Sequence, residues 1–165
     1  MRKIVILAAA ALLFARGAQA QPADPAAAET VSWSASAGSA PVKPDAALTV
    51  SLNAKVAEGW HVYALKQLPN GPTPLRITVD ANPLAAQAGD AKGSPPTIVH
   101  DPAFDLDTPL YSKAFTATLP LKLASHASAG KQSIPVTVRF QTCNGKICQP
   151  PKTVHLLAPV TVAKS

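Results

Sequence analysis

Methionine, cysteine and aromatic residues are scarce in this chain of 165 residues. Met1 is the single methionine, and the four histidines lie far apart in the sequence, which excludes a methionine-rich copper site. The basic residues form no cluster and are not interleaved with aromatic residues. Nucleic-acid-binding domains concentrate basic residues in a patch or stripe, so we expect no nucleic-acid partner.

The sequence also lacks a hydrophobic run long enough to span a bilayer, which takes about 20 residues. Its apolar run over residues 4–14 follows Arg2 and Lys3 and precedes Ala18-Gln19-Ala20, the small-x-small pattern of a signal-peptidase site. We therefore interpret residues 1–20 as a signal peptide and expect an exported protein with no transmembrane segment after cleavage. The mature chain then carries a net charge of +3, which favours solubility and gives only weak steering.

Apolar and polar residues alternate with a period of two along several segments. The longest of these are residues 48–56, 115–123 and 134–140, and this period is typical of half-buried strands. Shorter candidate strands are residues 31–35, 60–65, 75–79, 97–99 and 153–162. Pro120 suggests an edge strand or a bulge, because proline cannot donate to a β-ladder.

No segment after the signal peptide shows the period of an amphipathic helix. Short alternating strands separated by proline and glycine are typical of an all-β sandwich. Residues 21–30 are rich in proline and alanine without periodicity, so we interpret them as a flexible lead-in. A single domain over residues 31–165 is long enough to bury a core without disulfide staples.

The chain has only two cysteines, Cys143 and Cys148, on either side of Asn144–Ile147. Asn-Gly is a strong hairpin signal, so the two sulfurs are expected to be close enough for a disulfide. Continuing the alternation of residues 134–140 predicts that Cys143 points outward, to the polar face. A disulfide that closes so short a loop stabilises the fold by about 2 kcal/mol in the chain-entropy model, near the low end of the range for disulfides.

Spacing alone leaves two interpretations of the pair open. An accessible disulfide in an exported protein can exchange with thiols of other proteins, and the nearby Arg139, Lys146, Lys152 and His155 would favour a thiolate. A surface staple with no redox role fits the spacing equally well. Cys-x4-Cys is not a specific motif, and it lacks the two-residue spacing of thioredoxin-like sites.

The segment Phe140–Thr153, which contains both cysteines, resembles the active-site hairpin of the N-terminal periplasmic domain of the thiol:disulfide interchange protein DsbD. Glu58–Tyr63 is similar to a Gly-aromatic-x-x-Tyr strand of that family, and Asn70–Leu75 to its Gly-Pro-x-Pro turn. His100–Phe104, followed by Leu110-Tyr111, resembles its cap loop. The resemblance spans about residues 45–157 in the same order along the chain.

The resemblance implies an immunoglobulin-like β-sandwich whose Cys143 and Cys148 alternate between disulfide and dithiol, with Cys148 forming the mixed disulfide. It assigns Phe104 as the cap-loop ring over the sulfurs, and places His61 and Tyr63 beside the site on one strand face. The cap loop departs from the best-known member, because Pro102 and Ala103 stand where acidic residues occur there. Any proton-handling role of those carboxylates is then either absent or falls to Asp101 or Asp105.

Function is therefore expected to be thiol:disulfide interchange without a bound cofactor, a protein-disulfide reductase-type activity that depends on a separate electron donor. The expected partners are thioredoxin-fold periplasmic proteins or a membrane thiol electron transporter, and we expect a monomer. No metal site is expected, because no second ligand stands at a metal-like spacing from His100 or His155. The alternatives are a non-redox protein-binding sandwich with a structural hairpin disulfide and, less favoured, a metallochaperone using the two thiols.

Overall fold

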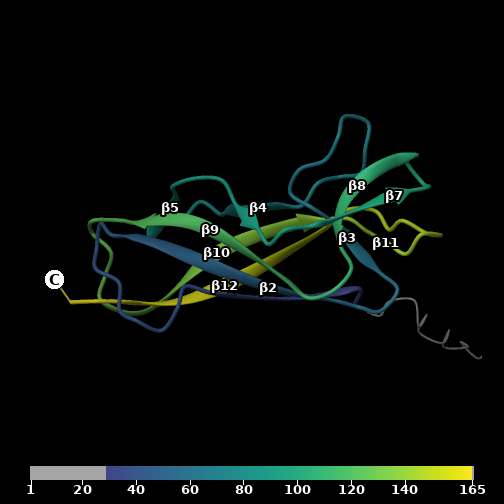
Figure 1. The fold of residues 1–165 in the computed structure, drawn as a ribbon. Coiled ribbons are helices and arrows are strands. Elements are labelled where there is room, and N and C mark those ends of the chain that lie inside the picture. Colours follow the sequence, from purple (N-terminus) through teal and green to yellow (C-terminus); the bar gives the residue numbers. More distant parts are fainter. Residues whose placement is uncertain (1–28, 165) are drawn as a thin grey trace, which may run out of the picture.

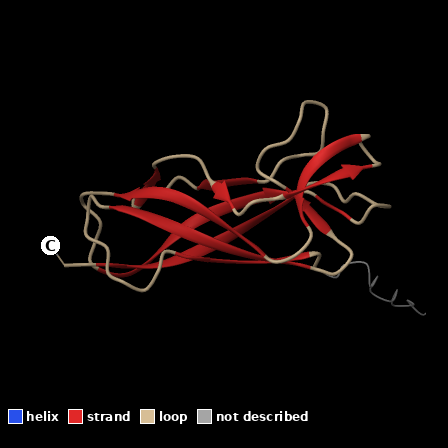
Figure 2. Cartoon of the chain, in the orientation of Figure 1, coloured by secondary structure: helices blue, strands red, loops and turns tan. Residues whose placement is uncertain are grey.

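The computed structural model describes residues 29–164, and this part of the chain folds into twelve β-strands without a helix (Figure 2). Residues 29–164 accordingly contain no helix capable of crossing a membrane. The predicted signal peptide and most of the predicted lead-in lie outside the described residues. Every strand pairing is antiparallel, and the strands form three sheets (Figure 1).

Two sheets face each other and form the sandwich. The first has the order β1-β2-β9-β5, with β6 also paired to β9; its strands are β1 (Val31–Ser36), β2 (Ala47–Val56), β9 (Phe115–Leu123), β5 (Ala85–Gln87) and β6 (Lys92–Gly93). The second has the order β12-β10-β4; its strands are β12 (Lys152–Val162), β10 (Gly130–Phe140) and β4 (Arg76–Val79).

A third sheet lies at one end of the sandwich, away from the C-terminus (Figure 1). It has the order β11-β3-β8-β7; its strands are β11 (Thr142–Cys143), β3 (His61–Tyr63), β8 (Leu106–Tyr111) and β7 (Thr97–Asp101). Strand β10 of the sandwich leads through one residue, Gln141, into β11 of this end sheet. The cysteine hairpin therefore stands where two sheets meet.

The core lies between the two large sheets and is built from the inward positions of the alternating strands. These positions are fully buried in β2, β9 and β10: Val50, Leu52, Leu119, Leu121, Ile134, Val136 and Val138. Trp33 of β1 closes one end of the core, with ring centroids 5.6 Å from Phe115 and 5.4 Å from Phe140. This arrangement confirms the predicted all-β, immunoglobulin-like sandwich.

The strands with one face on the core agree with the sequence prediction. Strand β9 has the predicted bounds, β2 differs from its prediction by one residue, and β10 begins four residues before its predicted start. Pro120 lies inside β9, between the ladder positions of β5 and β6, and its carbonyl accepts from the Ala88 amide on that side. Because the N and C=O of one residue in an antiparallel strand point to the same side, the missing N–H costs no bond to β2.

Four strands were not predicted: β5, β6, β8 and β11. Strands β5, β6 and β11 have only two or three residues, too few to show a period. Strand β8 carries Pro109 and three apolar residues that do not alternate, so its sequence shows no strand period. The predicted cap loop is thus a β-hairpin, β7–β8, with a turn at residues 102–105.

Candidate functional site

The two cysteines form a disulfide across a tight turn. Gly145 has φ +79°, whereas Asn144 stays out of the positive region. The Asn144 side chain supports the turn instead, because its Oδ1 accepts from the amides of Lys146 at 3.0 Å and Ile147 at 2.8 Å. The predicted hairpin is confirmed, with only its glycine in the left-handed conformation.

Side chains next to the cysteines fix where the hairpin leaves the sandwich. The Gln141 Oε1 accepts from the Thr73 amide at 2.9 Å, in the turn before β4. The buried Thr142 hydroxyl lies 3.3 Å from that of Thr30, and its carbonyl accepts from the Gln149 amide at 2.9 Å. Strand β11 then pairs with β3, which brings Cys143 opposite His61.

The prediction that Cys143 points outward is wrong. Cys143 is 1% exposed, whereas Cys148 is only partly buried. The alternation of β10 ends at Phe140, and the chain then changes sheets, so Thr142 and Cys143 are both buried in succession. The period of one strand says nothing about residues that pair with a different sheet.

The disulfide belongs to a small second hydrophobic cluster, separate from the main core. Tyr63, Leu110 and Cys143 form its buried part, and Phe104 and Cys148 pack against them. The pair is therefore asymmetric: Cys143 is buried, and Cys148 is the more exposed of the two cysteines. Leu110 was not among the predicted site residues, because its role depends on β8, which the sequence did not reveal.

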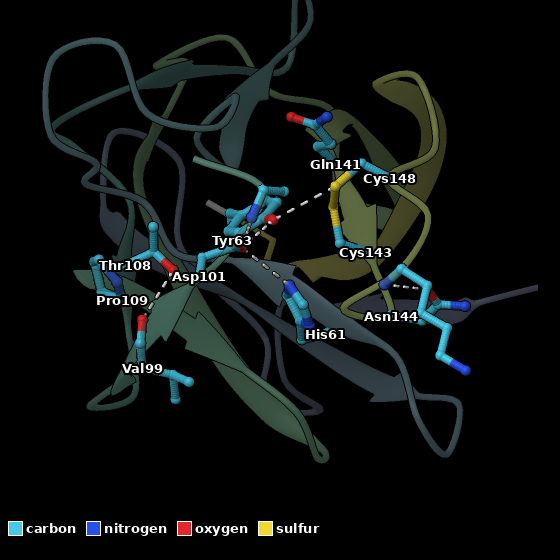
Figure 3. A network of polar contacts seen from close by, with 12 residues as sticks. His61, Tyr63, Val99, Asp101, Thr108, Pro109, Gln141, Cys143, Asn144 and Cys148 are labelled. Carbon is cyan, nitrogen blue, oxygen red and sulfur yellow. Dashed lines mark hydrogen bonds and ion pairs between the residues drawn. A yellow bond between two sulfur atoms is a disulfide. The ribbon is translucent and has the colours of Figure 1, made fainter. Parts of the chain in front are cut away.

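The Tyr63 hydroxyl group lies between the buried carboxylate of Asp101 and the disulfide (Figure 3). The Tyr63 hydroxyl donates to Asp101 Oδ2 at 2.5 Å, and the Tyr63 hydroxyl oxygen lies 3.8 Å from Cys148 Sγ. A phenol has one proton, and here it is directed at Asp101, so a lone pair of the oxygen is left for the sulfur. Burial and the bond to Asp101 raise the pKa of Tyr63 well above its ordinary value, which keeps this proton in place.

Asp101 also holds the turn of the β7–β8 hairpin. Its Oδ1 accepts from the Ala103 amide at 2.9 Å, and its carbonyl accepts from the Phe104 amide at 3.3 Å. The Phe104 ring meets the Tyr63 ring edge to face, with centroids 5.9 Å apart. One carboxylate therefore links the turn that carries Phe104 to the tyrosine beside the sulfur.

The His61 ring also meets the Tyr63 ring edge to face, with centroids 5.0 Å apart. Its Nε2 is 3.8 Å from Asp101 Oδ2 and, within residues 29–164, has no hydrogen-bond partner although it is buried. Burial lowers the pKa of His61, and the charge of Asp101 opposes this only in part. The predicted shared strand face of His61 and Tyr63 is confirmed.

Comparison with known proteins decides the family. A family model described as "Thiol:disulfide interchange protein DsbD, N-terminal" matches residues 25–158. The chain belongs to this family. No curated protein matches it.

Two solved structures show only distant similarity to the chain. They are BcpA, the major pilin subunit of Bacillus cereus (14% identity, TM-score 0.36), and a family 123 glycoside hydrolase from Clostridium perfringens (9% identity, TM-score 0.32). The matches cover 81% and 82% of this chain, but only 40% and 28% of the pilin and hydrolase chains. The chain thus spans less than half the length of either protein.

The structure brings the residues assigned from the DsbD family together at one end of the molecule. Phe104, Tyr63, His61 and Asp101 all lie around the disulfide. Asp105 does not, because its side chain is 95% exposed and faces His100 at 3.4 Å. His155 is also separate, since it pairs with Asp80 on the outer face of the β12-β10-β4 sheet.

A hollow of about 350 Å³ opens beside the site. Four apolar residues contribute to its lining, together with His61 and the tip of the cysteine hairpin: Val99 of β7, Leu110 of β8, Trp60 just before β3, and Pro102 in the β7–β8 turn. Within the described chain, no group of three or more His, Cys, Asp or Glu residues is arranged to hold a metal ion.

The environment of His61 predicts a loss of stability in acid. Its pKa in the folded state lies below the unfolded value of 6.5, so the unfolded chain binds more protons as the pH falls through that value. The free energy of unfolding should decrease from about pH 7 downward, until the folded-state pKa is passed. Urea unfolding across this range should show a weaker decrease for His61→Gln than for wild type.

The exposed His126 provides the control for this measurement. His126→Gln should keep the wild-type pH dependence. An unchanged dependence in His61→Gln would contradict the assignment to this ring.

Proposed function

We propose that this protein carries out thiol:disulfide interchange in the periplasm, through Cys143 and Cys148, with thioredoxin-fold proteins or a membrane thiol transporter. The observation that supports this most is the asymmetry of the disulfide in a member of the DsbD N-terminal family: Cys143 is buried and Cys148 is partly accessible. Disulfide exchange proceeds by attack of a thiolate on one sulfur of the bond. Here a partner can reach one sulfur more easily than the other.

Exchange takes place in two steps. A partner thiolate attacks Cys148 Sγ, the Cys143–Cys148 bond breaks, and Cys143 leaves as a thiolate that takes up a proton. The second partner thiol, once deprotonated, attacks the partner's own sulfur in the mixed disulfide, and Cys148 leaves. Two electrons and two protons pass from the partner to this domain, and delivery to an acceptor disulfide runs the same steps in reverse.

Phe104 is proposed to restrict access to Cys148 until a partner docks. Its ring packs on Tyr63 and belongs to the cluster around the sulfurs. A large apolar ring excludes small oxidants from a dithiol, and a docking protein can replace its contacts. Because Asp101 holds the turn that carries the ring, displacement of Phe104 would begin with movement of that turn.

Tyr63 and Asp101 are proposed to keep reduced Cys148 in its thiol form. The Tyr63 proton is committed to Asp101, so the oxygen can accept a hydrogen bond from an S–H group but cannot donate one to a thiolate. A nearby carboxylate also disfavours a second negative charge. The basic residues Arg139, Lys146, Lys152 and His155 were expected to favour a thiolate, but the charged group that the Tyr63 hydroxyl links to the sulfur is acidic.

A structural role for the disulfide remains the rival interpretation. The burial of Cys143 in a hydrophobic cluster is what a staple would also show. In that case the sandwich would bind a protein partner, and the disulfide would only stiffen the hairpin. Crosslinking of single-cysteine variants separates the two interpretations.

In the Cys143→Ser variant, Cys148 is first activated as a mixed disulfide with an aromatic thiol, which is a good leaving group. The activated variant should then form a mixed disulfide with a thioredoxin-fold protein that retains only its nucleophilic cysteine. The reason is the accessibility of Cys148. Gel electrophoresis under non-reducing conditions measures the rate. Cys148→Ser, activated in the same way, should react at least about tenfold more slowly because Cys143 is buried.

Each of these variants is the control for the other, since both lose the same disulfide. Equal crosslinking of the two would contradict the asymmetry. Absence of crosslinking in both would favour the structural role.

Asp101→Asn should make reduced Cys148 react more readily with iodoacetamide, because a neutral side chain no longer opposes a thiolate. The midpoint of the pH profile of alkylation should fall by about one pH unit relative to wild type. Tyr63→Phe should shift it in the same direction. Mass spectrometry of the alkylated peptides identifies which sulfur has reacted.

Asp105→Asn is the matched control on the same turn, and its midpoint should not move. A merely loosened cap would raise the rate at every pH without moving the midpoint. That result for Asp101→Asn would contradict the electrostatic role of this carboxylate.

A further inference from the structure

The two arginines of the described chain lie directly opposite each other. Arg76 is in β4, Arg139 is in β10, and the two are register partners. Their strand neighbours Ile77 and Val138 are buried in the core, so both arginines point to the outer face of the β12-β10-β4 sheet. Both are exposed.

This arginine pair has no acidic partner within residues 29–164. Of the nearby carboxylates, Asp80 accepts from Thr137 at 2.6 Å and pairs with His155, and Asp90 borders the same hollow as Arg76 without forming an ion pair. Like charges directly opposite each other on a sheet are destabilising. The repulsion between the two arginines therefore destabilises the isolated domain, and an anionic group placed between them would relieve this repulsion.

The pair lies at the end of the sheet that leads to the disulfide. Arg139 is four residues before Cys143, and Lys152, at the start of β12, is four residues after Cys148. Residues 139–153 contain three basic residues and no acidic one, the third being the exposed Lys146 at the tip of the hairpin. We call the outward-facing pair Arg76 and Arg139 the basic flank.

We propose that the basic flank is a docking surface for carboxylate groups that surround the reactive cysteine of a thiol partner. This inference rests on the proposed interchange function and adds the partner's charge to it. Charge complementarity determines the choice of partner: guanidinium groups bind carboxylates in a planar, two-point geometry, and a pair of them fits an acidic patch better than a neutral or basic one. The flank lies next to the hairpin, so contact there brings the partner's thiol toward Cys148.

Docking of this kind acts on the rate of encounter. Exposed charges at the rim of an interface change the association rate and its salt dependence more than they change the final affinity. The chemical step stays the same: the partner dithiol is oxidised to a disulfide, and the Cys143–Cys148 disulfide is reduced to two thiols. Acidic partners should therefore react faster at low salt, and their advantage should disappear at high salt.

Reduction of the oxidised domain by three synthetic dithiol peptides tests the proposal. The peptides share one Cys-Gly-Pro-Cys core and differ in a short tail of glutamate, glutamine or lysine. At an ionic strength of about 0.01 M, the glutamate peptide should reduce wild type about tenfold faster than the glutamine peptide. At about 1 M, where the screening length falls to about 3 Å, this preference should vanish.

Two double variants locate the effect. Arg76→Gln with Arg139→Gln should reduce the glutamate preference to within about twofold, and Arg76→Glu with Arg139→Glu should make the lysine peptide the fastest. Lys131→Gln with Lys164→Gln removes the same charge at the other end of the sandwich and should keep the wild-type preference. Thermal unfolding should show that the glutamine variants are no less stable than wild type, because they remove a repulsion.

The outcomes also distinguish this inference from the proposed function. Equal rates for the three peptides in wild type would overturn the docking surface while the disulfide still exchanges. An equal loss of preference in both glutamine variants would overturn its location. Failure of all three peptides to reduce the disulfide would contradict the interchange function, and the docking surface with it.

Discussion

The hydrogen bond from the Tyr63 hydroxyl to Asp101 connects all parts of the site. Tyr63 is fully buried in β3, and Asp101 is buried at the end of β7. The same carboxylate holds the turn that carries Phe104, and the same hydroxyl oxygen faces Cys148. This hydrogen bond therefore links the surroundings of the sulfur to the cap turn.

The sandwich contributes position rather than chemistry. Strand β10 is held between β12 and β4 over the core, and the chain then crosses to the end sheet at Gln141. This crossing buries Cys143 and leaves Cys148 at the surface of a small cluster. It also places the arginine pair of β4 and β10 on the outer face beside the hairpin. Access to the sulfur, its surroundings and the charge of its flank all follow from where β10 ends.

The sequence predicted those parts of the fold in which one strand face rests on the core. Strands β2 and β9 could be recognised because their inward residues are uniformly apolar. Strand β8 could not, since its burial depends on pairing with β7 and β3. For the same reason Asp101 could not be distinguished from Asp105, although one is buried under the cap and the other is exposed.

The orientation of Cys143 is the clearest failure of the period-two argument, because that period holds only while a strand stays in its own sheet. The assignment of Tyr63, His61 and Phe104 came from resemblance to the family rather than from periodicity. The pairing of Arg76 with Arg139 depends on the register of two strands that are far apart in sequence, and no local pattern reveals it.

The reduction potential of the Cys143–Cys148 disulfide is the most direct test of the central claim, that this bond opens and closes in exchange with other proteins. Equilibration with glutathione or dithiothreitol buffers, followed by thiol trapping, measures it. An exchanging pair should have a potential clearly above about −300 mV, within reach of thioredoxin-type dithiols. A potential below about −300 mV would be that of a structural disulfide and would contradict the account.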